Sequence, residues 1–377
     1  MNTPTPQLHD TPHDMAHPTP LRSRIAANLA GLLLATAGSA QATTVVYVSN
    51  ADSQEISVLQ LDKSKGTLQP LDTVKVGGTV MPLAVSPDRR FLYASLRSQP
   101  YRVTSFAIDA TSGRLTRLGE SSLADSMANI DTDRSGRWLF SASYGGGRIT
   151  VNEIGKDGVV GPARQLIETA PNAHAIHVDA ANHFVLATSL GGDNVSIWRF
   201  DPQAGKLTPN DPPLLAAPPK SGSRHFVWDK AQRFVYLIGE VDASLGVYAW
   251  DAQRGTLREL QRTTTLPAGF VGKPWAADLH LSPDGRFLYA SERSSSTIST
   301  FRVDATTGLL QPLGQTPTEK TPRGFAIDPS GAFLIAAGQE SNSVSVHAID
   351  PSSGALGTPS RIAVGKNPNW VEIVELR

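Results

Sequence analysis

The sequence contains no cysteine, which excludes disulfide bonds, thiolate nucleophiles and cysteine-ligated zinc sites. It also lacks an excess of either charge, because 34 lysines and arginines balance 34 aspartates and glutamates. A neutral chain has no bulk electrostatic attraction to nucleic acid or to an anionic membrane. The sequence shows no glycine-rich phosphate loop, no nucleophile-elbow serine and no convincing cluster of Asp, Glu and His ligands. We therefore expect no metal ion, no organic cofactor and no nucleic-acid partner.

Long apolar runs are also missing, apart from one near the N-terminus. Two arginines precede this run, which spans about residues 25–35, and an Ala-x-Ala cleavage signal ends at Ala42. The pattern predicts a secretory signal peptide over residues 1–42, and the run is too short for a permanent transmembrane helix. We therefore expect a periplasmic protein that is free of the membrane after cleavage. The alternatives are a disordered or amphipathic tail, and translation that starts at Met15 instead of Met1.

The rest of the chain repeats one pattern, in which a strand-like segment ends in Asp and Gly follows four positions later. Asp accepts hydrogen bonds from the backbone of its own turn, and Gly supplies the positive φ that the return needs. Six copies are complete: Asp62 and Gly66, Asp109 and Gly113, Asp201 and Gly205, Asp251 and Gly255, Asp304 and Gly308, Asp350 and Gly354. A seventh, weaker copy keeps Gly158 but has Ile154 in place of Asp.

Each copy holds four strand-like segments, and the copies lie about 45–53 residues apart. Four strands per repeat at this period predict a β-propeller; the alternative is a β-sandwich with chance similarity between segments. The first segment after the leader, VVYVSN, matches the second strand of a repeat, and PNWVEIVEL at the C-terminus matches the first. We therefore expect an all-β, seven-bladed propeller of residues 43–377, closed by the C-terminal strand pairing into the N-terminal blade.

Equivalent positions of the seven repeats form rings around the channel of a propeller. The ring at the start of the first strands, called here the arginine ring, consists of Asn369, Met81, Ala128, His174, Arg224, Ala277 and Arg323. The ring after the second strands, called here the rim, consists of Ala51, Arg97, Tyr144, Leu190, Glu240, Arg293 and Gln339. Charged groups on innermost strands cost free energy unless something uses them. The alternative is that they solvate a water-filled channel and pair with one another.

These rings predict a functional site at one mouth of the channel. Its expected catalytic residues are His174, Arg224, Glu240 and Arg323. Candidate substrate contacts are Arg293, Gln339, Asn369 and Lys273. Arginine can grip a carboxylate or stabilise an oxyanion, and histidine or glutamate can move a proton. The site therefore suits a small anionic or polyhydroxylated ligand.

The remaining histidines carry weaker expectations. His177 and His280 lie three positions beyond the arginine ring, where they either line the channel lower down or are buried in the core. His225 follows Arg224 and is expected to point to the opposite face of its strand. His183 and His347 are expected at the surface.

Three segments carry a resemblance to a known family. KPWAADLHLSPDGRFLYASERSSSTISTF, KTPRGFAIDPSGAFLIAAGQESNSVSV and SRHFVWDKAQRFVYLIGE resemble the seven-bladed lactonases, which include bacterial 6-phosphogluconolactonase and the fungal carboxymuconate cyclases. The resemblance extends over essentially all of residues 44–375. It implies opening of a sugar lactone without a metal ion.

The resemblance also implies roles for the four expected catalytic residues, because the site proposed for the fungal enzymes contains a His, two Arg and a Glu. Arg224 and Arg323 would bind the lactone carbonyl oxygen and any substrate carboxylate or phosphate. Glu240 or His174 would activate water or protonate the leaving hydroxyl, and the sequence does not decide between them.

The predicted export affects the expected substrate. Phosphorylated sugars are scarce outside the cytoplasm, so an unphosphorylated aldono- or aldarolactone rivals 6-phosphogluconolactone as the small-molecule partner. Two other functions compete with lactone hydrolysis: cycloisomerisation of a muconate-type acid, and ligand binding without catalysis. We expect a monomer or a weak homodimer.

Overall fold

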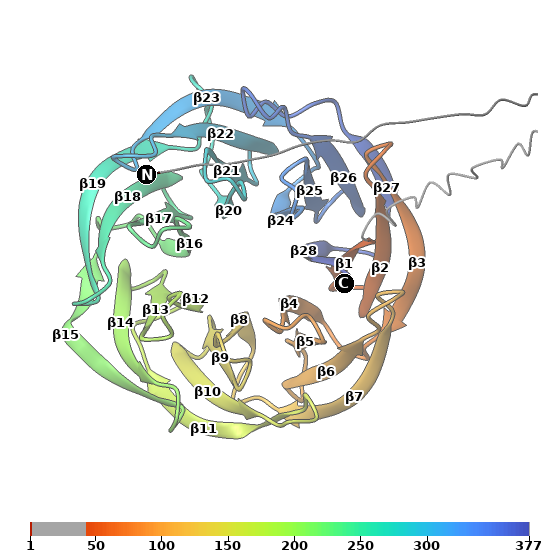
Figure 1. The fold of residues 1–377 in the computed structure, drawn as a ribbon, viewed down its shortest axis with the longest axis vertical. Coiled ribbons are helices and arrows are strands. Elements are labelled where there is room, and N and C mark those ends of the chain that lie inside the picture. Colours follow the sequence, from red (N-terminus) through yellow and green to blue (C-terminus); the bar gives the residue numbers. More distant parts are fainter. Residues whose placement is uncertain (2–42, 377) are drawn as a thin grey trace, which may run out of the picture. The chain divides into compact units, whose positions relative to one another are not determined.

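Besides the first residue, the computed structural model describes residues 43–376, and the predicted signal peptide lies outside them. These residues form seven four-stranded antiparallel sheets arranged as blades around a central channel (Figure 1). Residues 43–376 contain no α-helix, and so no helix of this part could cross a membrane. The predicted all-β, seven-bladed propeller is confirmed. The boundary at residue 43 stays a prediction.

The strands follow one order in every blade, from the channel outwards (Figure 1). The innermost strands of blades one to seven are β28 (Pro368–Glu375), β4 (Val80–Val85), β8 (Met127–Thr132), β12 (Ala173–Val178), β16 (Ser223–Trp228), β20 (Ala276–Leu281) and β24 (Pro322–Ile327). The second strands are β1 (Thr44–Asn50), β5 (Phe91–Leu96), β9 (Trp138–Ser143), β13 (Phe184–Ser189), β17 (Phe234–Gly239), β21 (Phe287–Glu292) and β25 (Phe333–Gly338). The third strands are β2 (Glu55–Asp62), β6 (Arg102–Ile108), β10 (Arg148–Ile154), β14 (Asn194–Asp201), β18 (Ser244–Asp251), β22 (Thr297–Val303) and β26 (Ser343–Ala348). The outermost strands are β3 (Thr67–Lys75), β7 (Leu115–Ser122), β11 (Val160–Glu168), β15 (Lys206–Ala216), β19 (Thr256–Thr264), β23 (Leu310–Pro317) and β27 (Ser360–Ala363).

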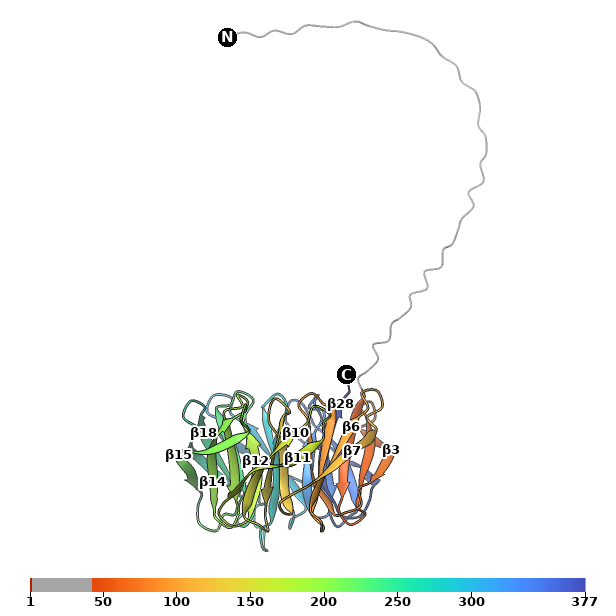
Figure 2. The same ribbon diagram turned by 90° about the horizontal axis from the view of Figure 1, so that it is seen from below.

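Blade one closes the ring as the sequence predicts. Strand β28 pairs antiparallel with β1, from Thr44 opposite Glu375 to Ser49 opposite Trp370. The two ends of the chain thus share one sheet, which joins the first and last repeats and closes the ring. Seen from the side, residues 43–376 form a disc with loops on two flat faces (Figure 2). We call the face where the innermost strands begin the upper face, and the other the lower face.

The Asp and Gly of the repeat serve both the turn and the packing of neighbouring blades. Asp201 Oδ1 accepts hydrogen bonds from the backbone N–H groups of Gln203 and Ala204, at 2.9 and 3.1 Å. Gly205 has a φ of +63°, and a Cβ built there would lie 2.3 Å from the ring of Trp138 in the preceding blade. The repeated glycine is therefore required twice, for its backbone conformation and for the close approach of a side chain from the preceding blade.

The hydrophobic core is divided among the interfaces between blades. Seven buried clusters each combine residues of two neighbouring sheets. Apolar packing of the disc therefore lies between blades. The channel-facing positions of the innermost strands can therefore carry polar side chains.

Each innermost strand shifts register against its second strand near its beginning. In blade five the paired positions run from Ser223 with Gly239 to Phe226 with Leu237, so that Arg224 and His225 lie opposite Ile238 alone. Such a bulge interrupts the strict alternation of side chains and re-aims one of them. Two consecutive residues of this strand can therefore face the channel.

Candidate active site

The core of the site is one carboxylate held between two guanidinium groups. Glu240 follows β17, and its Oε2 accepts from Nε of Arg224 on β16 at 2.7 Å and from a terminal nitrogen of Arg293, after β21, at 2.8 Å. The side chains of Arg224 and Arg293 are only 1% and 5% exposed. Burial raises the pKa of Glu240, but the charges of the two arginines outweigh it and the net pKa is lowered. Glu240 is therefore an ionised counter-ion and a weak base.

The guanidinium of Arg293 is held by an aromatic ring, two carbonyl oxygens and the carboxylate of Glu240. Its guanidinium lies 3.9 Å from the centre of the Trp275 ring and donates to the carbonyl oxygens of Trp275 and Ala276. Burial and the neighbouring charge of Arg224 lower its pKa to about 9. The sequence predicts Arg293 as a substrate contact. In the structure it belongs to one ionic cluster with Arg224 and Glu240.

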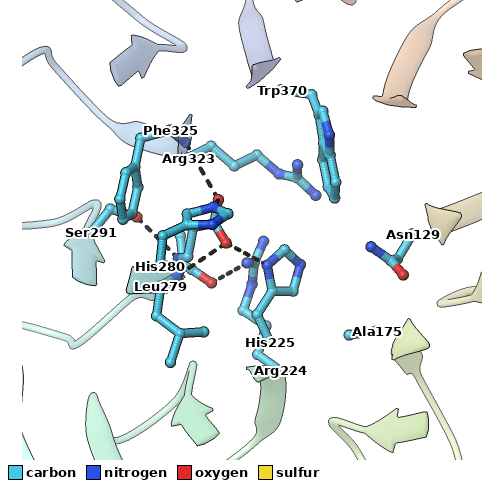
Figure 3. Close-up of polar contacts among 12 residues, drawn as sticks. Asn129, Ala175, Arg224, His225, Leu279, His280, Ser291, Arg323, Phe325 and Trp370 are labelled. Carbon is cyan, nitrogen blue, oxygen red and sulfur yellow. Dashed lines mark hydrogen bonds and ion pairs between the residues drawn. The ribbon is translucent and has the colours of Figure 1, made fainter. Parts of the chain in front are cut away.

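Arg323, on β24, completes a group of three buried arginines. Its pKa is held well below the usual range by burial first, and then by the charges of Arg224 and Arg293. Its guanidinium donates weakly to the carbonyl oxygen of Asn369, at 3.4 Å. No carboxylate of residues 43–376 forms an ion pair with it. Figure 3 shows its guanidinium extending toward the channel between Trp370 and His225. A buried cation in this state favours an anionic or strongly polar ligand.

His174, on β12, faces the same group. It is 4% exposed, and its ring lies against those of Tyr144 and His225, with centroids 6.0 and 5.0 Å away. Burial, followed by the charge of Arg224, holds its pKa well below the ordinary value of a histidine. His174 is therefore neutral at pH 7. Its Nδ1 has no hydrogen-bond partner in the described part of the chain.

The other three expected substrate contacts have different surroundings. Asn369 is fully buried, and its Nδ2 donates to the carbonyl oxygens of Ser49 and Val80, so it joins blades one and two. Gln339 donates to Asn367 Oδ1 at 2.9 Å on the upper face. Lys273 is exposed, and no hydrogen bond or ion pair links it to another described residue. The structure thus brings the arginines, Glu240 and His174 together and leaves Lys273 outside.

A second ring lies one residue below the arginine ring, and the sequence analysis missed it. We call it the histidine ring; it consists of Pro82, Asn129, Ala175, His225, Asp278, Gly324 and Trp370. The expectation that His225 points away from the channel is wrong, because the bulge at Arg224 and His225 places both on the channel side. His225 Nδ1 lies 2.7 Å from Asp278 Oδ1 of the next blade (Figure 3).

A cavity of about 490 Å³ lies below the histidine ring. The polar residues of the innermost strands that line it are Asn129, Asp131, His177, His225, Asp278, His280 and Glu372, and Arg134 and Gln232 line it from the turns that follow β8 and β16. None of the four expected catalytic residues lines it. His177 and His280 therefore line the lower channel, which is the first of the two expectations for them.

The expectation that His347 lies at the surface is wrong. It is fully buried on β26, where Nδ1 bonds to the carbonyl oxygen of Gly357 and Nε2 to Thr318 Oγ1, both at 3.0 Å. Its side chain fills the interface toward blade six, because alternate residues of the third strand face the neighbouring sheet. His183 is exposed as expected.

Comparison with known proteins agrees with this architecture. Residues 40–373 match the family described as Lactonase, 7-bladed beta-propeller. The chain belongs to this family and is therefore a lactonase. It is 40% identical over 332 residues to a 6-phosphogluconolactonase of Pectobacterium carotovorum, which covers 88% of this chain and 99% of the relative. It is 39% identical over 330 residues to the Serratia proteamaculans 6-phosphogluconolactonase, with 88% and 98% covered. Among solved structures, the periplasmic gluconolactonase of Pseudomonas aeruginosa superposes with a TM-score of 0.83 at 31% identity, covering 89% of this lactonase and all of the other chain.

Proposed function

We propose that this lactonase hydrolyses a sugar lactone at the arginine ring, with the carbonyl oxygen bound by Arg224 and Arg323. The observation that carries the proposal is the buried guanidinium of Arg323, which forms no ion pair within residues 43–376 and lies beside the Arg224–Glu240–Arg293 cluster. Opening a lactone places negative charge on the carbonyl oxygen, and fixed donors aimed at that oxygen stabilise it by about 3–4 kcal/mol each. The relatives named as sugar lactonases support this substrate class.

Glu240 then has a positioning role. Its carboxylate forms ion pairs with both Arg224 and Arg293 and holds their guanidinium groups in place. Of the two residues expected to move a proton, His174 is the better candidate, because it is neutral and its Nδ1 is free of partners among the described residues.

Two classes of sugar lactone are candidate substrates for the arginine cluster. The relatives' names favour 6-phosphogluconolactone, whereas the name of the Pseudomonas aeruginosa protein and the predicted leader favour an unphosphorylated aldono- or aldarolactone. The test is to incubate residues 43–377 with glucono-δ-lactone, its 6-phospho form and an aldarolactone, and to follow acid release. The enzyme should accelerate opening of at least one of them, and Arg323→Met should abolish most of the acceleration. Rates equal to spontaneous opening on all three lactones would contradict the proposal.

We further propose that the protein is exported and cleaved after Ala42. The Ala-x-Ala signal and the likeness to a periplasmic gluconolactonase support this. Mass spectrometry of the protein from a periplasmic extract should show a chain that begins at Thr43. A full-length chain in the cytoplasmic fraction would contradict export. Sedimentation of the mature protein should show a monomer or a weakly associating homodimer.

A further inference from the structure

Asp278 is built to orient the imidazole of His225. Its carboxylate accepts hydrogen bonds from the backbone N–H groups of Leu279 and Phe325, at 3.0 and 3.3 Å, and it contacts His280 Nε2 at 3.3 Å (Figure 3). Burial raises the pKa of Asp278, but His280 and His225 outweigh it and hold that pKa well below the usual range. An ionised Asp278 can only accept, so Nδ1 of His225 carries the hydrogen and donates it. The lone pair of His225 is thereby fixed on Nε2.

That lone pair faces the channel without a partner. His225 is 6% exposed, and its Nε2 is buried with no hydrogen bond to any described residue. The contrast with His347 is informative, because the two nitrogens of that buried histidine are both bonded. Most buried polar groups that serve only the fold are hydrogen-bonded, whereas Nε2 of His225 has no partner among residues 43–376.

A matching donor lies two blades away around the channel. Asn129 is 1% exposed, and its Oδ1 accepts from the backbone N–H of Ile176 at 3.0 Å, which directs Nδ2 to the other side. This Nδ2 is also buried without a partner among residues 43–376. Figure 3 shows the side chains of Asn129 and His225 on the two sides of Ala175, and both residues line the same cavity. A molecule with a hydroxyl group, water included, can donate to His225 Nε2 and accept from Asn129 Nδ2.

This space adjoins the proposed oxyanion site. His225 directly follows Arg224 along β16, and its ring centroid lies 5.0 Å from that of His174. The charges of Arg224 and Arg323 both act on His225. From below, His225 and Asn129 line the 490 Å³ cavity, which lies on the lower side of the arginine ring.

We propose that His225 is the general base of lactone opening, that Asp278 is its positioning residue, and that Asn129 holds the attacking water. This assignment rests on the proposed lactonase function of the arginine ring. The water oxygen forms a bond to the lactone carbonyl carbon while His225 Nε2 takes one of its protons. The oxyanion is held by Arg224 and Arg323. When the tetrahedral intermediate collapses, the bond from carbon to the ring oxygen breaks, and the imidazolium of His225 gives its proton to that oxygen. The product is a hydroxy acid, which then ionises.

Glu240 and His174, the two residues that the sequence predicts to move a proton, are less suited than His225 to take the proton of the attacking water. Glu240 is bound by two arginines, and no carboxylate within residues 43–376 orients His174. Proton transfer by His225 also depends on all titratable and charged groups around it. These come from four strands: His174 on β12, Arg224 on β16, Asp278 and His280 on β20, and Arg323 on β24.

The experiment compares His225→Ala, Asp278→Asn and His174→Asn with the wild type on the best lactone of the panel. The matched control is His183→Asn, which changes an exposed histidine in the turn between β12 and β13 that does not line the cavity, and it should leave kcat and KM unchanged. We expect His225→Ala to lower kcat by about 10²–10⁴-fold with a smaller change in KM, and added imidazole to restore part of the rate. Asp278→Asn should lower kcat and alter the pH dependence of kcat/KM, because an amide can stabilise the wrong tautomer. His174→Asn should cost less than His225→Ala.

The outcomes separate the two proposals. A wild type that opens no lactone overturns the proposed function, and this assignment with it. An active wild type whose rate survives in a folded His225→Ala variant overturns the assignment of the base alone. If His225→Ala does not fold, ¹⁵N NMR of the wild type decides: a neutral ring protonated on Nδ1 at pH 7 supports the assignment, and a ring protonated on Nε2 overturns it.

Discussion

Replacing Glu240 by Gln is the most direct perturbation of the ionic cluster. Glutamine keeps the shape of the side chain and one carbonyl oxygen, but it removes the negative charge between Arg224 and Arg293. Both arginines are almost fully buried, and the carboxylate itself is 16% exposed. The variant therefore leaves two neighbouring cations without their counter-ion in a poorly hydrated site.

The magnitude follows from the geometry. Two unit charges about 4 Å apart attract by about 4 kcal/mol at an effective dielectric constant of about 20, and two such pairs meet at Glu240. Dehydration offsets much of this attraction, and removal of one partner from a buried ion pair typically costs about 3–5 kcal/mol. With an unfolding entropy of about 2.1 cal/mol/K per residue over roughly 330 residues, this loss corresponds to a melting temperature lower by about 4–7 °C.

Differential scanning calorimetry measures the change, and the control is Glu340→Gln. Glu340 pairs with Lys320 at 2.8 Å on the upper face, but both side chains are more than half exposed, so the control should leave the melting temperature unchanged. Because the pKa of Glu240 is lowered in the folded state, its contribution is present above pH 4.5 and is lost as the pH falls through the folded pKa. The two variants should therefore converge in acid. Equal melting temperatures for both variants at pH 7 would refute the electrostatic argument.

Three further predictions follow from the same contacts. Arg323→Met removes a buried charge without a carboxylate partner, so calorimetry should show unchanged or higher stability while the lactonase rate falls about 10²–10³-fold; a large loss of stability would contradict this. Burial and the charge of Arg224 lower the pKa of His225 to about 3, so kcat/KM should stay flat from pH 7 to pH 5, where a histidine of ordinary pKa would lose activity. Since the unfolded chain binds this proton more readily, stability should also fall as the pH drops below 6.5. Gly205→Ala should destabilise by about 1–3 kcal/mol more than Gly285→Ala, because both glycines have positive φ but only the first meets Trp138; equal denaturation midpoints would exclude that clash.

The propeller could be predicted because its signals are local and repeated. Each Asp and Gly of the repeat defines a turn within five residues, and seven copies at one period leave few other architectures. Equivalent positions in a closed ring then face the same channel, which is how Arg224, Glu240 and Arg323 emerged from sequence alone. Their separation along the chain did not matter, because the repeat supplied the spatial relation.

The histidine ring was missed because alternation fails at a bulge. A regular strand would turn His225 away from the channel, and only the register shift against β17 shows otherwise. The pairing of His225 with Asp278 joins two blades and therefore leaves no pattern within one repeat. One signal was present: both residues occupy the same position of adjacent repeats, one step after the arginine ring. The contacts of Asn369 were hidden for a similar reason, because its amide bonds cross from blade one to blade two.

The stacking of the two rings links binding of the carbonyl oxygen to proton transfer. In the free enzyme, burial lowers the pKa of His225, and the positive charges of Arg224 and Arg323 lower it further and help to keep the ring neutral. A neutral imidazole is ready to accept a proton, although a low pKa also makes it a weak base. As the lactone carbonyl becomes an oxyanion, its negative charge offsets the same two arginines, and the pKa of His225 must rise at the moment when the proton is transferred. The arginines would thus stabilise the oxyanion directly and would strengthen the base only in the transition state, which is the condition under which an interaction raises kcat.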